Sequence, residues 1–275
     1  MMNVYDGAYQ VLLQTDAAAK VAEAIALYQN WQQGHLTRDG ASTLVERVPI
    51  PGRPLKPDLI SPTAVQQRKL STLEGRLALL HAVAHIEFNA INLALDAVYR
   101  FREMPDAYYG DWLQVAAEEA HHFALLRERM ATLGMQYGDL AAHNGLWDQA
   151  CRTDQDVMIR MALVPRVLEA RGLDVTPPMM QRLREAKDFA SVEVLEVILR
   201  EEVGHVRIGS RWYHYCCEQR GLEPESTFKQ LLGTLPTPPR SPFYTAGRLE
   251  AGFSSEELAM MLELEQQWLA EIRQR

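Results

Sequence analysis

The sequence predicts an all-α protein, with four long helices in the core and an additional helix at each end of the chain. Three observations support this class. Apolar residues recur at steps of three or four along most of the chain, which is typical of amphipathic helices. No segment shows the alternation of apolar and polar residues between turn signals that strands require. Segments rich in proline and glycine separate the helical stretches.

The composition is that of an ordinary globular domain, and we predict a single domain over residues 1–275. The chain is 47% apolar and 23% charged, and its net charge of −8 argues against broad binding to nucleic-acid phosphates. Its three cysteines form no C-x-x-C pair, so we expect neither a disulfide framework nor a thiolate zinc site. With no secretory leader and no apolar run of about 18 residues, we predict a cytoplasmic protein with no membrane partner.

The N-terminal extension, residues 1–66, is predicted to contain one helix and an extended connector. Residues 7–33 are rich in alanine and carry apolar residues at helical spacing. The stretch PIPGRPLKPDLISP at 49–62 contains prolines that disfavour a helix and favour a strap along the surface.

The predicted core covers residues 67–219 and opens with two long helices. The first covers residues 67–102, and the second covers residues 107–133 and is stopped by Gly134. Residues 134–154 contain several helix breakers and are expected to be irregular.

The third core helix is predicted from Asp156 to Gly172, with a kink at Pro165. A turn is expected at Asp174–Pro178, and the fourth helix occupies residues 179–219 with an early interruption. The C-terminal extension, residues 220–275, then holds a short helix at Phe228–Leu232, a second proline strap at 237–242, and a last helix capped by Ser254 or Ser255 and ending near Gln274.

Six ionisable residues lie on the apolar stripes of the four core helices. They are Glu87 on the first, Glu119 and His122 on the second, Glu169 on the third, and Glu202 and His205 on the fourth. Each E-x-x-H pair lies on one helix face, because residues three apart are about one turn apart. Glu87 precedes Glu119 by 32 residues and Glu169 precedes Glu202 by 33, so the two halves of the core repeat one pattern.

Four carboxylates and two imidazoles that face inward from four helices are the ligand set of ferritin-like di-iron and di-manganese proteins. Oxygen and imidazole ligands favour iron or manganese, so we expect two iron ions, with manganese as the alternative metal. E-x-x-H alone is a weak signal, and Glu118 with His121 forms an overlapping pair. We choose Glu119 and His122 because the overlapping pair lies on a more mixed face. A metal-free bundle with hydrogen-bonded Glu and His side chains remains the alternative.

Three other residues are candidates for contacts with the ligands. His85 lies two residues before Glu87 and could hydrogen-bond to a ligand, although a polar helix–helix contact is the simpler interpretation. Arg166, three residues before Glu169, could form an ion pair with a core carboxylate. Tyr213 could carry a radical or relay electrons, although bulky core packing is the simpler interpretation.

The chain resembles an uncharacterised bacterial family of ferritin-like proteins, known as a domain of unknown function. The resemblance covers residues 51–257 and is carried by the stretches AHIEFNAINLALDA, AAEEAHHFALL, PRVLEARGLDVTP and EVLEVILREEVGHVRIG. It implies a four-helix fold and the same six ligands, and it implies no particular reaction.

The leading functional hypothesis is a di-iron or di-manganese oxidase or monooxygenase that activates dioxygen or peroxide to hydroxylate or oxidise a substrate. We expect a small-molecule or modified-nucleotide substrate and a separate electron donor. A homodimer is the candidate oligomeric state. An apolar channel bounded partly by residues 34–66 or 223–253 should lead to the metals. Iron storage and a metal-free structural role are the alternatives.

Overall fold

The computed structural model describes residues 2–65 and 68–274 and confirms the all-α class. The chain divides into two compact units. The first comprises Met1–Asp154 and Met180–Val197, and the second comprises Gln155–Met179 and Ile198–Arg275. We describe each unit by itself.

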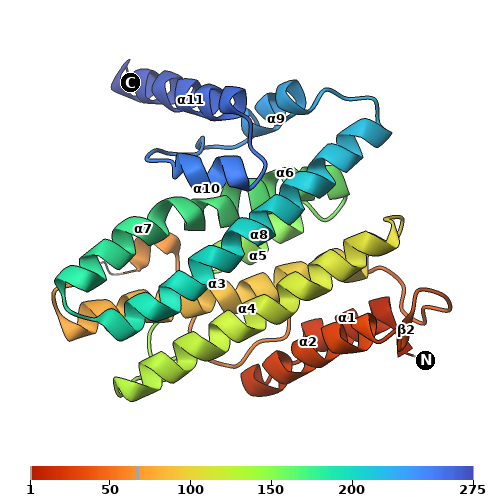
Figure 1. The fold of residues 1–275 in the computed structure, drawn as a ribbon, viewed down its shortest axis with the longest axis horizontal. Helices are drawn as coiled ribbons and strands as arrows, with labels where there is room; N and C mark the ends of the chain where they lie inside the picture. Colours follow the sequence, from red (N-terminus) through yellow and green to blue (C-terminus); the bar gives the residue numbers. More distant parts are fainter. Residues whose placement is uncertain (1, 66–67, 275) are drawn as a thin grey trace. The chain divides into compact units, whose positions relative to one another are not determined.

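The first unit is built on two long helices, α3 (Leu73–Arg100) and α4 (Asp106–Thr132), which lie side by side (Figure 1). They are antiparallel, because the Tyr108 hydroxyl at the start of α4 donates to Ala97 O near the end of α3. This confirms both predicted helices. Thr72 caps α3 by accepting a hydrogen bond from Gly75 N at 3.1 Å, so the helix begins later than predicted. Residue 67, its predicted start, lies outside the described residues.

Helix α3 is the one helix among the described residues that is long and apolar enough to cross a membrane. However, 72% of its most apolar window is buried inside the protein, as in the core helix of a soluble protein. The cytoplasmic location stays a prediction.

The predicted N-terminal helix is in fact two helices, α1 (Val4–Leu13) and α2 (Ala17–Gln32). The chain breaks at Asp16, whose carboxylate accepts a hydrogen bond from Ala19 N at 2.8 Å and so starts a new helix. Helix α1 packs on α3 and α2 packs on α4. Two short parallel strands, β1 (Met2–Asn3) and β2 (Leu36–Thr37), were not predicted, because two residues are too few to show an alternating pattern.

The loop predicted over residues 134–154 contains a short helix, α5 (Gly145–Arg152), so the prediction was wrong there. Trp147 is buried, and its indole N–H donates to Val48 O at 3.1 Å and to Pro49 O, the first residue of the proline strap, at 3.2 Å. The helix therefore forms by docking onto the proline strap, a long-range contact that local breakers do not reveal. A 3₁₀ turn, η1 (Pro62–Ala64), lies at the end of that strap.

The second unit begins with α6 (Val157–Leu163), which continues directly into a π-helix, η2 (Val164–Glu169). The π-helix lies where the sequence predicts a kink. Pro165 has no N–H for the helical hydrogen-bond ladder, and the wider turn accommodates it.

The predicted turn at Asp174–Pro178 is wrong, because α7 (Ala170–Glu185) runs straight through it. The Thr176 hydroxyl donates to Gly172 O at 2.8 Å, and fully buried Leu173 and Leu183 hold the helix on either side of the prolines. The chain breaks later, at residues 186–188, where Lys187 has a φ of 59°.

The fourth predicted helix is α8 (Phe189–Gln219), which starts at this break and so confirms the early interruption. It passes from the first unit into the second at Val197–Ile198. The remaining helices of the second unit are α9 (Pro224–Leu232), α10 (Thr245–Glu250) and α11 (Ser255–Gln274), of which α10 was not predicted.

Ser254 is the cap of α11. Its hydroxyl accepts a hydrogen bond from Glu257 N at 3.0 Å, and its own N–H donates to Glu257 Oε2 at 3.0 Å. This reciprocal capping box resolves the choice between Ser254 and Ser255.

Candidate metal centre

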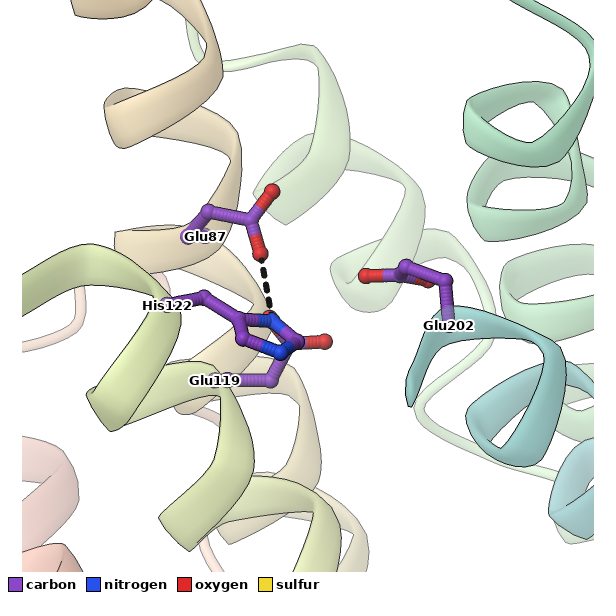
Figure 2. A group of neighbouring side chains, drawn as sticks. All are labelled: Glu87, Glu119, His122 and Glu202. Atoms are coloured by element: carbon purple, nitrogen blue, oxygen red, sulfur yellow. Dashed lines mark hydrogen bonds and ion pairs between the residues drawn. The ribbon is translucent and has the colours of Figure 1, made fainter. Parts of the chain in front are cut away.

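Helices α3 and α4 bring three of the predicted ligands together in the first unit (Figure 2). His122 Nδ1 lies 3.1 Å from Glu87 Oε2, where the imidazole donates to the carboxylate, and 3.4 Å from Glu119 Oε2. Their candidate ligand atoms all lie within 4.8 Å of one another, and all three residues are buried. This buried acidic and histidine group could hold a metal ion.

The packing of α4 separates the two overlapping E-x-x-H pairs. Glu119 and His122 are both 0% exposed. In contrast, His121 is exposed, and partly exposed Glu118 accepts a hydrogen bond from Gln114 at 2.8 Å. Burial therefore agrees with the pair chosen from the sequence, while ligation itself stays a prediction.

The second unit holds the other three predicted ligands. Glu169 is the last residue of the π-helix, and Glu202 and His205 lie on α8. Glu202 is labelled in Figure 2. Glu169 and Glu202 are each 9% exposed and His205 is 0% exposed. His205 Nδ1 lies 3.8 Å from Glu202 Oε1, a longer separation than in the first pair.

The π-helix runs antiparallel to α8. Arg166 Nε donates to Ser210 Oγ at 3.2 Å, whereas Met158, earlier in the chain, contacts Cys217, later in α8. The pairs Arg166–Ser210 and Met158–Cys217 set how the two segments align. Three residues beyond Arg166, this alignment brings Glu169 to within about one helical turn of His205 along the axis of α8.

Glycine allows the two segments to approach this closely. A Cβ atom at Gly209 would lie 2.4 Å from both Cβ and Cγ of Pro165, closer than any real side chain tolerates. Since Gly209 is one turn beyond His205 and Pro165 is one turn before Glu169, this contact sets the spacing between the helices that carry these ligands.

Each unit thus holds two buried carboxylates and one buried imidazole. Burying several carboxylates near one another is unfavourable without compensating positive charge. First-row divalent ions with oxygen and imidazole preference, iron and manganese, match this donor set, and thiolate ligands are not part of it.

His85 makes its hydrogen bonds away from the carboxylates. Its Nδ1 pairs with the Tyr137 hydroxyl at 2.9 Å, and its Nε2 pairs with His143 O at 3.0 Å. Burial lowers the pKa of the His85 imidazole to about 4, so the ring is neutral near pH 7. These contacts fix α3 to the segment that follows α4.

Arg166 and Tyr213 belong to one buried cluster. The guanidinium of Arg166 donates from Nη2 to Glu257 Oε2 at 2.6 Å. It also lies over three aromatic rings, with centroids 4.8, 4.2 and 4.5 Å from its Cζ, those of Tyr213, Phe228 and Phe253. The Tyr213 hydroxyl donates to Pro224 O at 2.7 Å. The carboxylate that pairs with Arg166 therefore comes from α11, outside the predicted core.

Sequence reasoning missed two residues of this region, Glu257 and Arg248. Glu257 lies three residues after Ser254 in a capping motif, S-x-x-E, and nothing in that local motif indicates a pairing with Arg166. Arg248 is 1% exposed and makes two hydrogen bonds with Asp174, at 2.9 and 2.8 Å. No local pattern marks a contact between residues 74 positions apart.

Two surface hollows of about 680 and 350 Å³ involve the predicted extensions, and neither is lined by a predicted metal ligand. Residues of 34–66 line part of the larger hollow, and residues of 223–253 line part of the smaller one. The apolar channel to the metals stays a prediction.

Comparison with known proteins places the chain in a family. Residues 13–259 match the family described as "Protein of unknown function (DUF455)". The chain is 49% identical over 221 residues to an uncharacterised protein of Haemophilus influenzae, a match that covers 78% of this chain and 77% of the relative. No solved structure matches. The chain belongs to the DUF455 family.

Proposed function

We propose that this member of the DUF455 family is a ferritin-like oxidoreductase that binds two iron ions, with manganese as the alternative metal. The observation that carries the proposal is the buried group of Glu87, Glu119 and His122. Its ligand types recur in the second unit, where Glu169 lies within about one turn of His205, and these are the ligand types of dinuclear carboxylate proteins.

Glu87, Glu119 and His122 would supply ligands from α3 and α4. Glu169, Glu202 and His205 would supply the others from the π-helix and α8. When bound, the ions would supply redox chemistry with dioxygen or peroxide, leading to hydroxylation or oxidation of a substrate.

The chain's own residues would keep the site ordered and dry. Phe88 and Phe123, adjacent in sequence to Glu87 and His122, pack with their ring centroids 5.2 Å apart and are almost fully buried. This ring pair belongs to the apolar core that α3 and α4 form next to the predicted ligands. His122 Nδ1 lies 3.1 Å from Glu87 Oε2, so a metal ion held by both atoms would replace the hydrogen bond between them.

The proposal is tested by titrating anaerobically prepared metal-free protein with Fe(II) and measuring bound iron. We expect about two ions per chain, and on exposure to air we expect oxidation limited to those two. His122→Ala should lose iron, whereas the matched variant His121→Ala, on the exposed side of the same helix, should retain it.

Two results would contradict the proposal. Absence of bound iron and manganese in the wild-type protein would favour a metal-free structural bundle. Retention of far more iron than six ligands can hold would favour storage.

A further inference from the structure

We infer that Arg166 and Arg248 are positioning residues for Glu169, and that the C-terminal helices α10 and α11 are therefore part of the metal site's support. This inference rests on the proposed function, because it treats Glu169 as a metal ligand. All the residues in the argument lie within the second unit.

The starting point is the π-helix that carries Glu169. A π-helix is rare, and the single π-turns that occur inside α-helices are frequently found at functional sites. If Val164–Glu169 relaxed to an α-helix, the register would shift by one residue and rotate Glu169 by about 100° around the helix axis. Glu169 would then point away from the helix face it now occupies, so something must hold the π-turn in place.

Arg166 holds the turn from within. It is 0% exposed, and its guanidinium is fixed by Glu257 of α11 and by Ser210 of α8. Tyr213, Phe228 and Phe253 surround it. A one-residue shift of the turn would pull Arg166 out of this enclosure, so the ion pair with α11 favours the π conformation.

Arg248 of α10 holds the residues that follow. Its Nη2 donates to Ala170 O, the carbonyl directly after Glu169, at 3.3 Å. The same guanidinium donates two hydrogen bonds to Asp174, one turn further along α7. The two arginines thus fix the backbone three residues before Glu169 and one residue after it.

The two ion pairs are not optimised for stability alone. Both are buried, and burying an ion pair gains little unless its remaining polar atoms are also satisfied. Among the described atoms, Nη1 of Arg166, Nη1 of Arg248 and Oε1 of Glu257 have no hydrogen-bond partner. Ion pairs that are directional but leave some of their polar atoms without a hydrogen bond suit a role in fixing the geometry of the π-turn.

The test uses Glu257→Gln, which keeps an oxygen to accept the hydrogen bond from Ser254 N but removes the charge that pairs with Arg166. Mn(II) binding is measured by equilibrium dialysis. We expect one of the two ions to bind at least tenfold more weakly, as when a ligand loses its support, while the other is unchanged. Asp174→Asn should act in the same direction.

Arg220→Met is the matched control. Arg220 also forms a bidentate ion pair within the second unit, with Asp156 at 2.7 and 2.9 Å, and both of these residues lie outside the π-turn and outside α10 and α11. It should leave Mn(II) binding unchanged.

A second readout needs no metal. In the metal-free protein, amide hydrogen exchange in the peptide spanning residues 164–170 should become at least tenfold faster in Glu257→Gln and stay unchanged in Arg220→Met. Unchanged exchange in Glu257→Gln, or wild-type affinity for both ions, would overturn the inference and leave the proposed function intact. Failure of the wild-type protein to bind Mn(II) or Fe(II) would overturn both.

Discussion

The two sets of predicted ligands share one sequence pattern but are supported in different ways. In the first unit, Glu87 and His122 lie on two regular α-helices and are joined by a hydrogen bond of 3.1 Å. In the second unit, Glu169 lies on a π-helix with two buried arginines beside it. Arg166 of the π-helix donates to Glu257 of α11, and Arg248 of α10 donates to the backbone directly after Glu169. A repeated ligand pattern therefore does not imply a repeated structure. Regular packing suffices for one half, whereas the other depends on distant residues.

The largest expected effect is that of bound metal on the free energy of unfolding. Bound metal should raise the free energy of unfolding by about 4 kcal/mol at a free concentration 1,000 times the Kd. Glu119→Leu should lose this increment and should itself stabilise the metal-free protein, because it removes a fully buried carboxylate that lies beside a second buried carboxylate, that of Glu87. Urea unfolding with and without Mn(II) measures both effects. A metal-free variant less stable than the metal-free wild type would contradict this account of the first half.

A buried lysine in the first unit makes the stability of the protein depend on pH. Lys20 in the first unit is 0% exposed and donates to Leu12 O, Gly52 O and Asn92 Oδ1, all neutral acceptors. Burial lowers the pKa of its ammonium from 10.5 to about 7. Between these values the unfolded chain binds the proton that the folded chain has released, so stability rises with pH.

We therefore expect Lys20 to contribute an increase of about 2 kcal/mol in the free energy of unfolding between pH 7 and pH 9. Lys20→Met should remove this increase, whereas Lys229→Met, at an exposed position, should retain it. Urea unfolding at several pH values measures the slope. Parallel slopes for Lys20→Met and the wild type would show that Lys20 keeps its charge when buried.

The glycine contact at the second half predicts a smaller effect. Gly209→Ala should destabilise the protein by roughly 1–3 kcal/mol, because its Cβ would overlap Pro165. Gly204→Ala lies on the same helix with no atom within 4 Å of its Cβ, and it should stabilise by up to about 1 kcal/mol through helix propensity. Thermal unfolding compares the two. Equal effects would mean that the close approach of the π-helix is not required.

The smallest expected effect is at the cap of α11. Ser254→Ala should cost about 1 kcal/mol, since it removes the hydroxyl that accepts from Glu257 N. Exposed Ser255→Ala should change the stability by less than about 0.5 kcal/mol. Chemical denaturation resolves the difference, and a reversed order would move the cap to Ser255.

The long core helices could be predicted because their apolar periodicity extends over many turns. The same periodicity distinguished buried His122 from exposed His121. Predictions failed where a distant contact decides the local structure. Trp147 docks on the strap and forms α5, and Leu173 and Leu183 carry α7 through two prolines.

The candidate site divides in the same way. Its six ligands could be proposed from spacing alone, since spacing reports which residues share a helix face. Their supports could not, because Glu257 and Arg248 reach the π-turn from positions far along the chain. A proline inside a helical pattern signals irregularity but does not say whether a kink or a π-turn results.

The sequence separation of the two supports gives the halves an order of assembly during translation. Glu87 and His122 are 35 residues apart, so both have been synthesised by the time the ribosome reaches the middle of the chain. Arg166 waits for Glu257, 91 residues later. Because the N-terminal parts of a nascent chain fold first, we expect a metal ion present during synthesis to meet the ligands of α3 and α4 well before Glu169 is held in place.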